Sequence, residues 1–375
     1  GIADPAGIRL VLRHWFAVPS AMNSILFFVG WCAGWVCFVG AARRGGTRRY
    51  TARSPGDSSR RDPVSVVVPC RNEEGNVPEL LGSLQRSLRS ADQVIVVDDN
   101  SIDATSRVAE ECGATVIHVG LLPDGWAGKP YACWLGARHG THETIIFIDA
   151  DVRVGPNAID DIVNVLDEYP TAVVSVMPWH HTGTLVEQLS MMFNVVSSLV
   201  GGIQTRHGTR RVAYGPFMAV RRDVYMSVGG HANEQVRRAV VEDLAIARTM
   251  PESVALLGRE KEVEYRMYPH GWNQLLEGWT KNTALGAVSV PRWSAIGTIV
   301  WVASLCGGVV TSPWFYVLSA GQMWMFSRRV GNFGPISVLL YPVHAMVFVG
   351  VALRSAVRSA LFGSVTWRGR SIDTR

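Results

Sequence analysis

The sequence predicts an α/β domain, with a mostly parallel sheet covered by helices on both faces, attached to transmembrane helices. Two observations predict this fold class. Short apolar runs alternate with helical segments between residues 64 and 151, and such alternation is typical of a parallel sheet. Long apolar stretches lie near both ends of the 375-residue chain, and these have the length that membrane helices need.

The apolar runs predict four strands, and the segments between them predict three helices. The first run, VSVVVPC, follows a linker that contains Pro, Gly and Ser, as expected where a folded domain begins. Ser101 stands where its side chain can cap the second helix. The predicted strands are residues 64–70, 94–99, 115–119 and 144–151, and the predicted helices begin at residue 73 and cover 101–112 and 129–139.

The first apolar stretch, residues 22–41, contains no charged side chain, and it is about long enough to cross a bilayer. A cleaved signal peptide is the alternative, but the run is too long and no A-x-A cleavage site follows. Four arginines follow within residues 43–49, and basic residues beside a span predict that this side is cytoplasmic. We therefore expect a multi-pass protein of the cell membrane whose α/β domain is cytoplasmic.

The C-terminal apolar region is expected to add two or three spans. Residues 296–327 form one long helix or a hairpin at Ser312 and Pro313, and residues 335–356 form a final span. Three crossings in total, or a re-entrant segment 314–327, keep the C-terminal arginines cytoplasmic. The predicted organisation is an N-terminal segment 1–20, a transmembrane helix 21–42, a basic linker 43–62, an α/β domain 63–285, a membrane region 286–360 and a basic tail 361–375.

Two carboxylates end the fourth predicted strand, in the run TIIFIDADV. Ligands of parallel α/β sheets bind at the carboxyl ends of strands, and alternation along an extended chain puts Asp149 and Asp151 on one side. Two converging carboxylates are costly unless a cation lies between them. Hard oxygen ligands suit Mg²⁺ or Mn²⁺. A surface turn is the alternative interpretation of so short a motif.

Composition argues against several other kinds of protein and site. The net charge of +5 comes without a basic–aromatic stripe, so we expect an anionic membrane surface rather than nucleic acid as partner. The six cysteines show no CxxC spacing, which disfavours a zinc site or a disulfide framework. No acidic residue lies inside the apolar stretches, which disfavours a transporter.

Several motifs, in this order, resemble family 2 glycosyltransferases of the GT-A fold: VSVVVPCRNEEGNVPELL, VIVVDDNSID, GWAGKPYACWLGA and FIDADV. Further motifs resemble the carotenoid glycosyltransferase branch of that family: GPFMAV, SVGGH, VVEDLAIA, YRMYPHG, LEGWTKN, SRRVGNFG and VTWRGR. The similarity extends over nearly the whole chain after the first span. It implies transfer of a sugar from a nucleotide diphosphate sugar, with a metal ion bridging the phosphates.

The resemblance also implies roles for individual residues. Asp151 is implied as the metal ligand, with Asp149 contacting the metal or the ribose. Asp98 and Asp99 could instead cap the N-terminus of the helix that follows. Lys129 could instead be a solvent-exposed lysine at the start of a helix. The residues implied in nucleotide-sugar binding are Pro69, Arg71, Glu73, Asp98, Asp99, Lys129, Asp149 and Ala150.

The acidic pair in VVEDLAIA is implied to be catalytic. Asp243 is expected to be the base that takes the acceptor's proton, and Glu242 matters more if the acceptor is a carboxylic acid that is already ionised. Two acids at a helix start are the alternative interpretation. The residues implied in acceptor or diphosphate contact are Tyr214, Gly215, Pro216, His181, Trp279 and Lys281. Trp279 could instead anchor the chain at the membrane surface.

The predicted function is therefore that of an inverting glycosyltransferase. Its donor is a UDP-sugar, with glucose as the sugar that the family suggests, and its acceptor is an apolar membrane molecule, a carotenoid carboxylate or hydroxyl. The alternative acceptors are a polyprenyl phosphate or a glycolipid. The alternative outside enzymes is a membrane protein that only binds sugar nucleotides.

Overall fold

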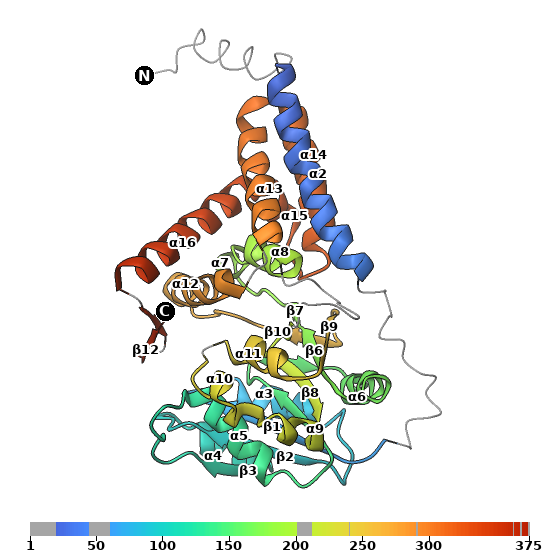
Figure 1. The fold of residues 1–375 in the computed structure, drawn as a ribbon, viewed down its shortest axis with the longest axis vertical. Helices are drawn as coiled ribbons and strands as arrows, with labels where there is room; N and C mark the ends of the chain where they lie inside the picture. Colours follow the sequence, from blue (N-terminus) through green and yellow to red (C-terminus); the bar gives the residue numbers. More distant parts are fainter. Residues whose placement is uncertain are drawn as a thin grey trace. The chain divides into compact units, whose positions relative to one another are not determined.

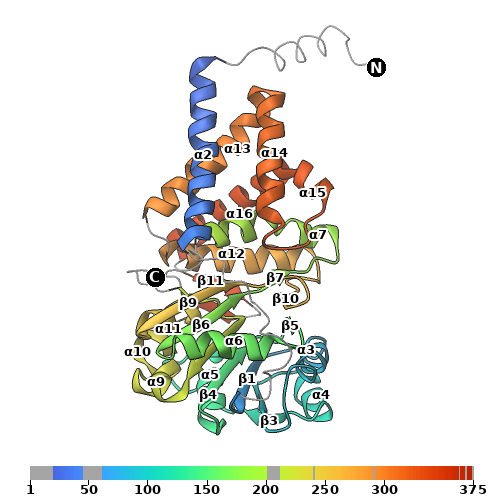
Figure 2. The same cartoon turned by 90° about the vertical axis from the view of Figure 1, so that its right-hand side faces the viewer.

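The computed structural model describes residues 20–44, 61–200, 212–239, 241–289, 292–362, 364–367 and 370–373. The chain forms two compact units, coloured along the sequence in Figures 1 and 2. Unit 2 comprises residues 43–181 and 202–267, and unit 1 comprises residues 1–42, 182–201 and 268–375. Residues 182–200 and 268–285, which the sequence assigned to the α/β domain, thus group with the apolar helices of unit 1. Residues 1–19 and 45–60, the predicted N-terminal segment and most of the predicted linker, lie outside the described residues.

A seven-stranded sheet in the order β3-β2-β1-β4-β8-β6-β9 forms the centre of unit 2. The first four of these strands are parallel to one another. Strand β8 runs antiparallel between β4 and β6, so the predicted mostly parallel sheet is confirmed. The strands are β1 (Val64–Cys70), β2 (Gln93–Asp98), β3 (Thr115–His118), β4 (Thr144–Ile148), β6 (Ala172–Met177), β8 (Phe217–Arg221) and β9 (Glu252–Leu257).

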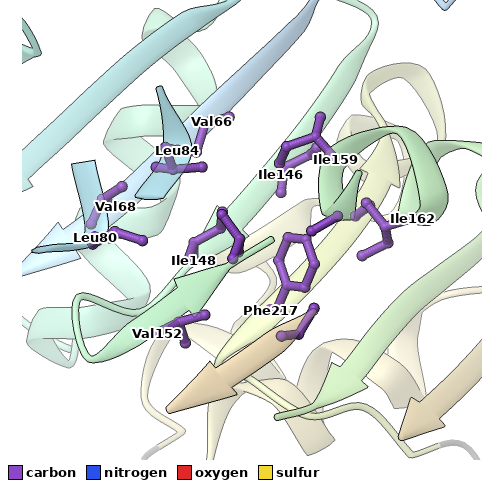
Figure 3. Close-up of a cluster of buried hydrophobic side chains, with 14 of the residues drawn as sticks. Val66, Val68, Leu80, Leu84, Ile146, Ile148, Val152, Ile159, Ile162 and Phe217 are labelled. Atoms are coloured by element: carbon purple, nitrogen blue, oxygen red, sulfur yellow. The ribbon is translucent and has the colours of Figure 1, made fainter. Parts of the chain in front are cut away.

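The continuous apolar character of these strands follows from burial on both faces. Alternate side chains of β1 enter different clusters: Val66 and Val68 join one core, and Val67 joins the other. Figure 3 shows the first cluster, where Ile146 and Ile148 of β4 meet helix side chains. The helices of unit 2 are α3 (Val77–Leu84), α4 (Thr105–Glu111), α5 (Gly128–His139), α6 (Ala158–Glu168), α9 (Arg222–Ser227), η1 (Gly230–Ala232), α10 (Glu234–Arg237) and α11 (Glu242–Thr249).

Helix α4 begins later than predicted, and Ser101 does not cap it. The cap position is Ala104, and the backbone N–H of Thr105 donates to the carboxylate of Asp103 at 3.0 Å. The Ser101 hydroxyl instead donates to Asp98. The loop after β2 is therefore closed by its own acidic side chains, and this delays the helix by one turn.

The fourth strand also ends earlier than predicted. It stops at Ile148, and a turn follows in which the N–H of Val152 donates to the carbonyl of Asp149 at 3.1 Å. The extended alternation predicted for Asp149 and Asp151 is therefore wrong. The chain turns because the buried Val152 belongs to a second, three-stranded sheet, which contains β5 (Val152–Val154), β10 (Val263–Tyr265) and β7 (Trp179–His180).

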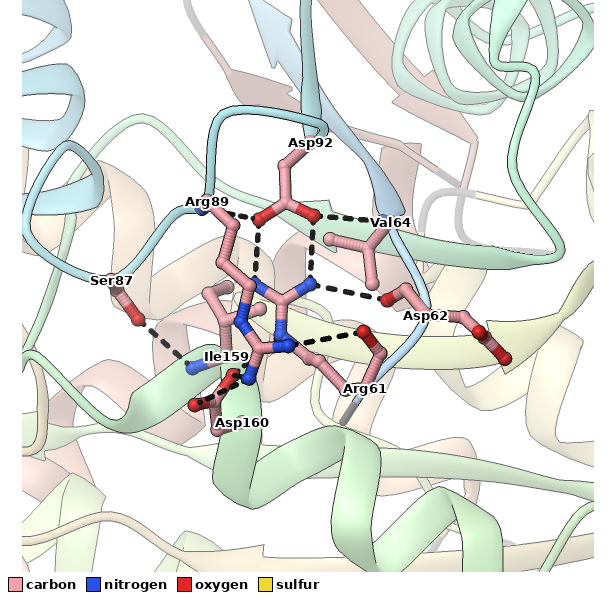
Figure 4. A network of polar contacts seen from close by, with 8 residues as sticks. All are labelled: Arg61, Asp62, Val64, Ser87, Arg89, Asp92, Ile159 and Asp160. Atoms are coloured by element: carbon pink, nitrogen blue, oxygen red, sulfur yellow. Dashed lines mark hydrogen bonds and ion pairs between the residues drawn. The ribbon is translucent and has the colours of Figure 1, made fainter. Parts of the chain in front are cut away.

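A buried ionic cluster joins the start of β1 to the loop before β2 and to α6 (Figure 4). The guanidinium of Arg61 donates to both oxygens of Asp92, at 2.7 and 2.6 Å, and also to Asp160. Asp92 additionally accepts from the N–H groups of Val64 and Arg89, at 3.0 and 2.7 Å. Burial by itself raises the pKa of Asp92, but the hydrogen bonds from Arg61 and from these backbone groups hold it below its ordinary value.

We expect Asp92→Asn to destabilise unit 2 by about 3–5 kcal/mol, because the buried Arg61 loses its bidentate carboxylate partner and is left with the carboxylate of Asp160. The side chains of Arg61 and Asp92 are only 4 % and 0 % exposed. The check is the denaturant midpoint of the detergent-solubilised chain. Glu111→Gln, which removes an ion pair to Arg107 that is 65 % and 59 % exposed, is the matched control and should cost less than about 0.5 kcal/mol.

Unit 1 is mainly helical. Three of its described helices are long and apolar enough to cross a membrane: residues 21–38, 292–311 and 341–361. The predicted segment 296–327 is a hairpin, because α13 ends at Thr311 and α14 begins at Pro313. The elements are α2 (Ala21–Arg44), α7 (Leu185–Gln188), α8 (Met191–Val200), α12 (Trp272–Ser289), α13 (Arg292–Thr311), α14 (Pro313–Ser327), α15 (Pro335–Leu339), α16 (Tyr341–Phe362), β11 (Ser364–Trp367) and β12 (Arg370–Asp373).

Small residues bring α2 and α13 into close contact. A Cβ at Gly30 would lie 2.3 Å from the Cβ of Ser304, and one at Gly34 would lie 2.4 Å from the ring of Trp301. This four-residue spacing of glycines is a common device for close packing of membrane helices. The indole N–H of Trp301 donates to the buried side chain of Gln322 on α14 at 2.8 Å.

Candidate active site

The turn after β4 lies beside the loop that leads into β8. Strands β4 and β8 are antiparallel neighbours, with Ile148 opposite Phe217, so the end of one adjoins the start of the other. The N–H of Asp149 donates to the carbonyl of Pro216 at 2.9 Å. Sheet topology therefore brings the predicted metal turn next to the predicted acceptor loop, residues 214–216.

Lys129 connects this turn to the acidic pair of α11. Its ammonium lies 2.7 and 2.9 Å from the two carboxylate oxygens of Asp149, and 2.7 Å from Oε1 of Glu242. The side chain of Lys129 is 35 % exposed and that of Glu242 only 6 %. The predicted contact of Lys129 with a diphosphate stays a prediction, and a bound diphosphate would compete with these carboxylates for the ammonium.

The charges of this cluster shift one another's pKa values. Burial lowers the pKa of Lys129, but Asp149 and Glu242 raise it well above its ordinary value, so the ammonium stays charged. Burial raises the pKa of Glu242, but Lys129 reverses the effect and holds it below its ordinary value. Burial leaves the pKa of Asp149 raised, despite the ammonium beside it.

Asp243 is held by backbone donors rather than by a cation. Its carboxylate accepts from the N–H of Gly215 at 2.7 Å and from the N–H of Leu244 at 2.8 Å. Burial, followed by the charge of Glu242, raises the pKa of Asp243 to about 6. A Cβ at residue 215 would lie 3.2 Å from Asp243 and 3.3 Å from Glu242, so glycine lets the loop approach both acids closely.

Tyr214 lies beside the same acid. Its hydroxyl oxygen is buried and has no hydrogen-bond partner among the residues that the structure describes. Burial and the charge of Asp243 raise the pKa of Tyr214, so the hydroxyl keeps its proton. It is thus able to donate a hydrogen bond to a bound molecule. The role of residues 214–216 in acceptor contact stays a prediction.

The two acids after β2 have different surroundings. The carboxylate of Asp98 accepts from the hydroxyls of Ser101 and Ser106 and lies 3.5 Å from Nδ1 of His118. Asp98 thus supports the loop that leads into α4 through side-chain hydroxyls and does not cap that helix. Asp99 is also buried and lies 3.7 Å from the guanidinium of Arg71. Contact with a nucleotide stays a prediction for both, and the geometry favours Asp99.

The loop after β1 meets this region. Pro69 is paired with Val97 inside the sheet, and Arg71 donates to the carbonyl of Asp99 at 3.0 Å. The N–H of Glu73 donates to the hydroxyl of Thr105 at 2.8 Å. These contacts bring the first two strand ends together, as expected for a site at the carboxyl edge of the sheet.

The remaining predicted acceptor residues lie elsewhere. His181 is exposed, and its N–H donates to the carbonyl of Tyr265 at 2.9 Å. Trp279 belongs to unit 1, where its ring stacks on Phe193 at 4.6 Å and its N–H donates to Ser190 at 3.0 Å. Lys281 follows on the same helix, α12. Their contact with an acceptor stays a prediction, and Trp279 is a buried packing residue within unit 1.

A buried histidine behind the cluster was not predicted. His231 is fully buried and pairs through Nδ1 with the hydroxyl of Tyr225 at 2.8 Å. Burial, together with Lys129 and against Glu242, lowers the pKa of His231 to about 4, so the ring is neutral. Gly230 has φ +49, and a Cβ there would lie 2.3 Å from the Tyr225 ring. The motif SVGGH was the sequence signal for this packing.

The predicted metal requires oxygen donors. Among the described residues, no group of three or more His, Cys, Asp or Glu side chains is arranged to hold a metal ion. Carboxylate oxygens suit Mg²⁺ or Mn²⁺, which are often held by one or two carboxylates plus phosphate oxygens of the substrate. Both oxygens of Asp149 lie on the Lys129 ammonium, so a metal ion would fit there only when a diphosphate draws that ammonium away, and the role of Asp149 and Asp151 as metal ligands stays a prediction. A cation here would depend on the bound diphosphate for the rest of its ligands.

The chain is similar to known glycosyltransferases in sequence and in fold. The family model described as Glycosyl transferase family 2 matches residues 65–229. The 4,4'-diaponeurosporenoate glycosyltransferase of Staphylococcus aureus strain USA300 is 30% identical over 337 residues, which cover 82% of this chain and 87% of that protein. One solved structure with a similar fold is the mannosyltransferase PcManGT from Pyrobaculum calidifontis in complex with GDP-Man and Mn²⁺. Its sequence is 16% identical to this one and the TM-score is 0.54. The match covers 89% of this chain and 98% of that chain. The likeness to the solved structure concerns the fold.

Proposed function

Since the chain belongs to glycosyl transferase family 2, we propose that it transfers a sugar from a UDP-sugar to an apolar acceptor in the membrane, with inversion at the anomeric carbon. The sugar proposed is glucose, and the acceptor is a carotenoid carboxylate or hydroxyl. The acceptor class is supported by the Staphylococcus relative, whose name specifies diaponeurosporenoate. The apolar helices of unit 1 agree with an acceptor that partitions into a bilayer.

The observation that carries this proposal is the meeting of two acidic motifs at one loop. The Asp149 turn bonds to Pro216, and Asp243 accepts from Gly215, so residues 215–216 contact both. One motif is suited to the diphosphate side of a reaction and the other to proton removal. A site that only bound sugar nucleotides would not need a carboxylate with a pKa near 6 held beside it.

The proposed chemistry is a single displacement. The acceptor oxygen attacks the anomeric carbon from the face opposite the diphosphate, Asp243 takes the acceptor's proton, and the bond from the anomeric carbon to the diphosphate breaks as UDP leaves. Asp243 suits the base role better than Glu242, because Lys129 stabilises the charged form of Glu242. The N–H of Gly215 fixes the orientation of the base.

On the donor side, Asp99 and Arg71 are proposed to contact the nucleotide, and Lys129 the diphosphate. Asp151, together with Asp149, would hold Mg²⁺ or Mn²⁺. The metal, when bound, would stabilise the negative charge that develops on the leaving diphosphate. The Pyrobaculum mannosyltransferase was solved as a complex with Mn²⁺, which agrees with a metal-dependent reaction.

The membrane placement is also a proposal. We propose that the protein is a multi-pass protein of the cell membrane and that unit 2 is cytoplasmic, where soluble UDP-sugars are available. The four arginines at the C-terminal end of α2 and just after it, together with the apolar acceptor, support this side. An enzyme with a soluble donor and a membrane acceptor has to work at this interface.

The deciding assay offers UDP-glucose with Mg²⁺ or Mn²⁺ to the detergent-solubilised chain, with diaponeurosporenoic acid and a hydroxylated carotenoid in separate tubes. We expect a glucosylated product by mass, and its loss by at least about 10²-fold in Asp151→Asn, because a metal ligand is removed. Asp223→Asn, on an exposed helix start, is the control and should keep full activity. Product on a polyprenyl phosphate or a glycolipid alone would reassign the acceptor, and no product on any acceptor would contradict the proposal.

A further inference from the structure

The two ends of the α2–α13–α14 bundle can be identified from side-chain contacts. At one end Phe27 stacks on Phe315 with ring centroids 4.1 Å apart. At the other end Phe38 stacks on Phe326, also at 4.1 Å, and the guanidinium of Arg329 lies 6.0 Å from the Phe38 ring. Helices α2 and α14 therefore run in the same direction, and the loop after α14 lies at the end of the bundle from which the arginine-rich linker leaves.

That loop is fixed by polar contacts which suit the membrane surface. Asn332 accepts from the N–H of Thr182 at 2.7 Å and donates to its carbonyl at 3.2 Å. Gln188 accepts from the N–H of Gly334 at 3.0 Å and from the hydroxyl of Ser337 at 2.6 Å. Asn332, five residues after the end of α14, thus lies near the arginine-rich end of the bundle, and from there the chain runs along the segment 182–188 as far as Ser337.

Helix α16, however, begins well inside the bundle. Tyr316, near the start of α14, donates to the carbonyl of Leu339 and packs against Tyr341 with ring centroids 5.4 Å apart. Tyr316 lies eleven residues before Ser327, the last residue of α14, a rise of about 17 Å. The hydrocarbon core of a bilayer is about 30 Å thick. The chain has therefore entered to about half of that depth when α16 starts.

The far half of α16 returns to the level at which the chain entered. Its Ser355 donates to the carbonyl of Thr280 on α12 at 3.0 Å. The adjacent Trp279 donates to Ser190, two residues after Gln188, so this part of α12 is tied to the segment that binds the 332–337 loop. Arg354 and Arg358 lie in this half of α16. Figures 1 and 2 show α16 running obliquely to α2, α13 and α14.

We infer that α15 and α16 form a re-entrant arm, which enters and leaves the bilayer on the arginine-rich side. Among the described helices, α2 and α13 then cross, and α14 returns the chain to the arginine-rich side, although its 15 residues fall short of the length that α2, α13 and α16 reach. The C-terminal strands β11 and β12 stay on the side of the linker. One exposed face of the arm contacts the acyl chains of that leaflet; its large apolar residues are Val343, Met346, Val349, Leu353, Val357 and Leu361. Length and composition alone would make α16 a span, as the sequence predicted for 335–356.

The test is cysteine accessibility in sealed vesicles, with native cysteines kept and labels located by peptide mass. The variants Arg329→Cys, Leu340→Cys and Trp314→Cys all change exposed side chains. We expect an impermeant maleimide to label residue 329 only from the face that carries unit 2 and residue 314 only from the opposite face. Residue 340 should be labelled only after detergent is added.

Labelling of residue 340 from the same face as residue 314 would overturn the inference, because α16 would then cross. Labelling of residue 329 from that face would overturn it as well. Leu339→Cys and Leu361→Cys are reserve variants in case one of the first three fails to fold. Residue 339 is expected to behave like residue 340. Residue 361 is expected to be labelled from the face that carries unit 2. The inference rests on the proposed membrane placement. Release of the chain from vesicles by alkaline carbonate would contradict both the membrane placement and the re-entrant arm. If the protein is inactive in the transfer assay, the labelling results still decide whether the arm is re-entrant.

Discussion

Replacement of Asp243 by asparagine is expected to slow transfer to a hydroxylated carotenoid by about 10²- to 10⁴-fold, the usual contribution of a general base. An asparagine keeps the hydrogen bond from Gly215 but cannot accept the proton. Transfer to a carotenoid acid should fall much less, because that acceptor is already ionised near neutral pH. The measurement is the initial rate for each acceptor, and Asp223→Asn is the exposed control. Equal rates for variant and native protein on the hydroxyl acceptor would remove Asp243 from the base role.

The pH dependence follows from the same carboxylate. Its pKa is raised to about 6, and a base works only when deprotonated. The rate on the hydroxyl acceptor should therefore fall as pH decreases through about 6 and level off above it. With the carotenoid acid as acceptor, the fall in rate at low pH should be smaller. A rate on the hydroxyl acceptor that stays constant from pH 5 to 7 would contradict the assignment.

Replacement of Lys129 by methionine is expected to lower activity by about 10²-fold or more, as when one group that stabilises developing charge is lost. It also leaves Asp149 and Glu242 without their shared cation. Because the Lys129 side chain is 35 % exposed, water screens part of the loss, and we expect a destabilisation of about 1–3 kcal/mol. Activity and the denaturant midpoint are measured on the same preparation.

Lys261→Met is the matched control for this variant. Lys261 is exposed in the turn before β10, and its replacement should alter neither activity nor stability. Lys129→Arg keeps the charge, and we expect it to restore more stability than activity, because the planar guanidinium has a different shape from the ammonium. If Lys129→Met were as active as the control, the ion cluster would have no part in the reaction.

The sequence was sufficient to predict the strands that carry the site. Runs such as VSVVVPC and TIIFI are buried on both faces, and this makes their pattern unambiguous. The direction of β8 could not be predicted in this way, because an antiparallel strand inside a parallel sheet is fixed by long-range pairing. The adjacency of residues 214–216 to the Asp149 turn depends on that pairing.

The partners of individual charges were also beyond sequence reasoning. Asp98 and Asp99 are neighbours in sequence, yet one supports a loop and the other faces Arg71. The bridge from Lys129 to Glu242 joins residues more than a hundred positions apart. From the sequence, Trp279 was expected to contact the acceptor or to anchor the chain at the membrane surface. Only its contacts with Phe193 and Ser190 show that it packs within unit 1.

The position of β8 limits how related chains can diverge in length. This strand is hydrogen-bonded to β4 on one side and β6 on the other. Because this pairing fixes the start of the strand, a residue gained or lost between Tyr214 and Phe217 would have to be absorbed by the loop itself, and it would displace the contacts of Pro216 with Asp149 and of Gly215 with Asp243. Tolerable evolutionary change in this loop is therefore substitution rather than insertion or deletion. Changes in acceptor preference along this lineage would have to arise from side chains, on a loop of constant length.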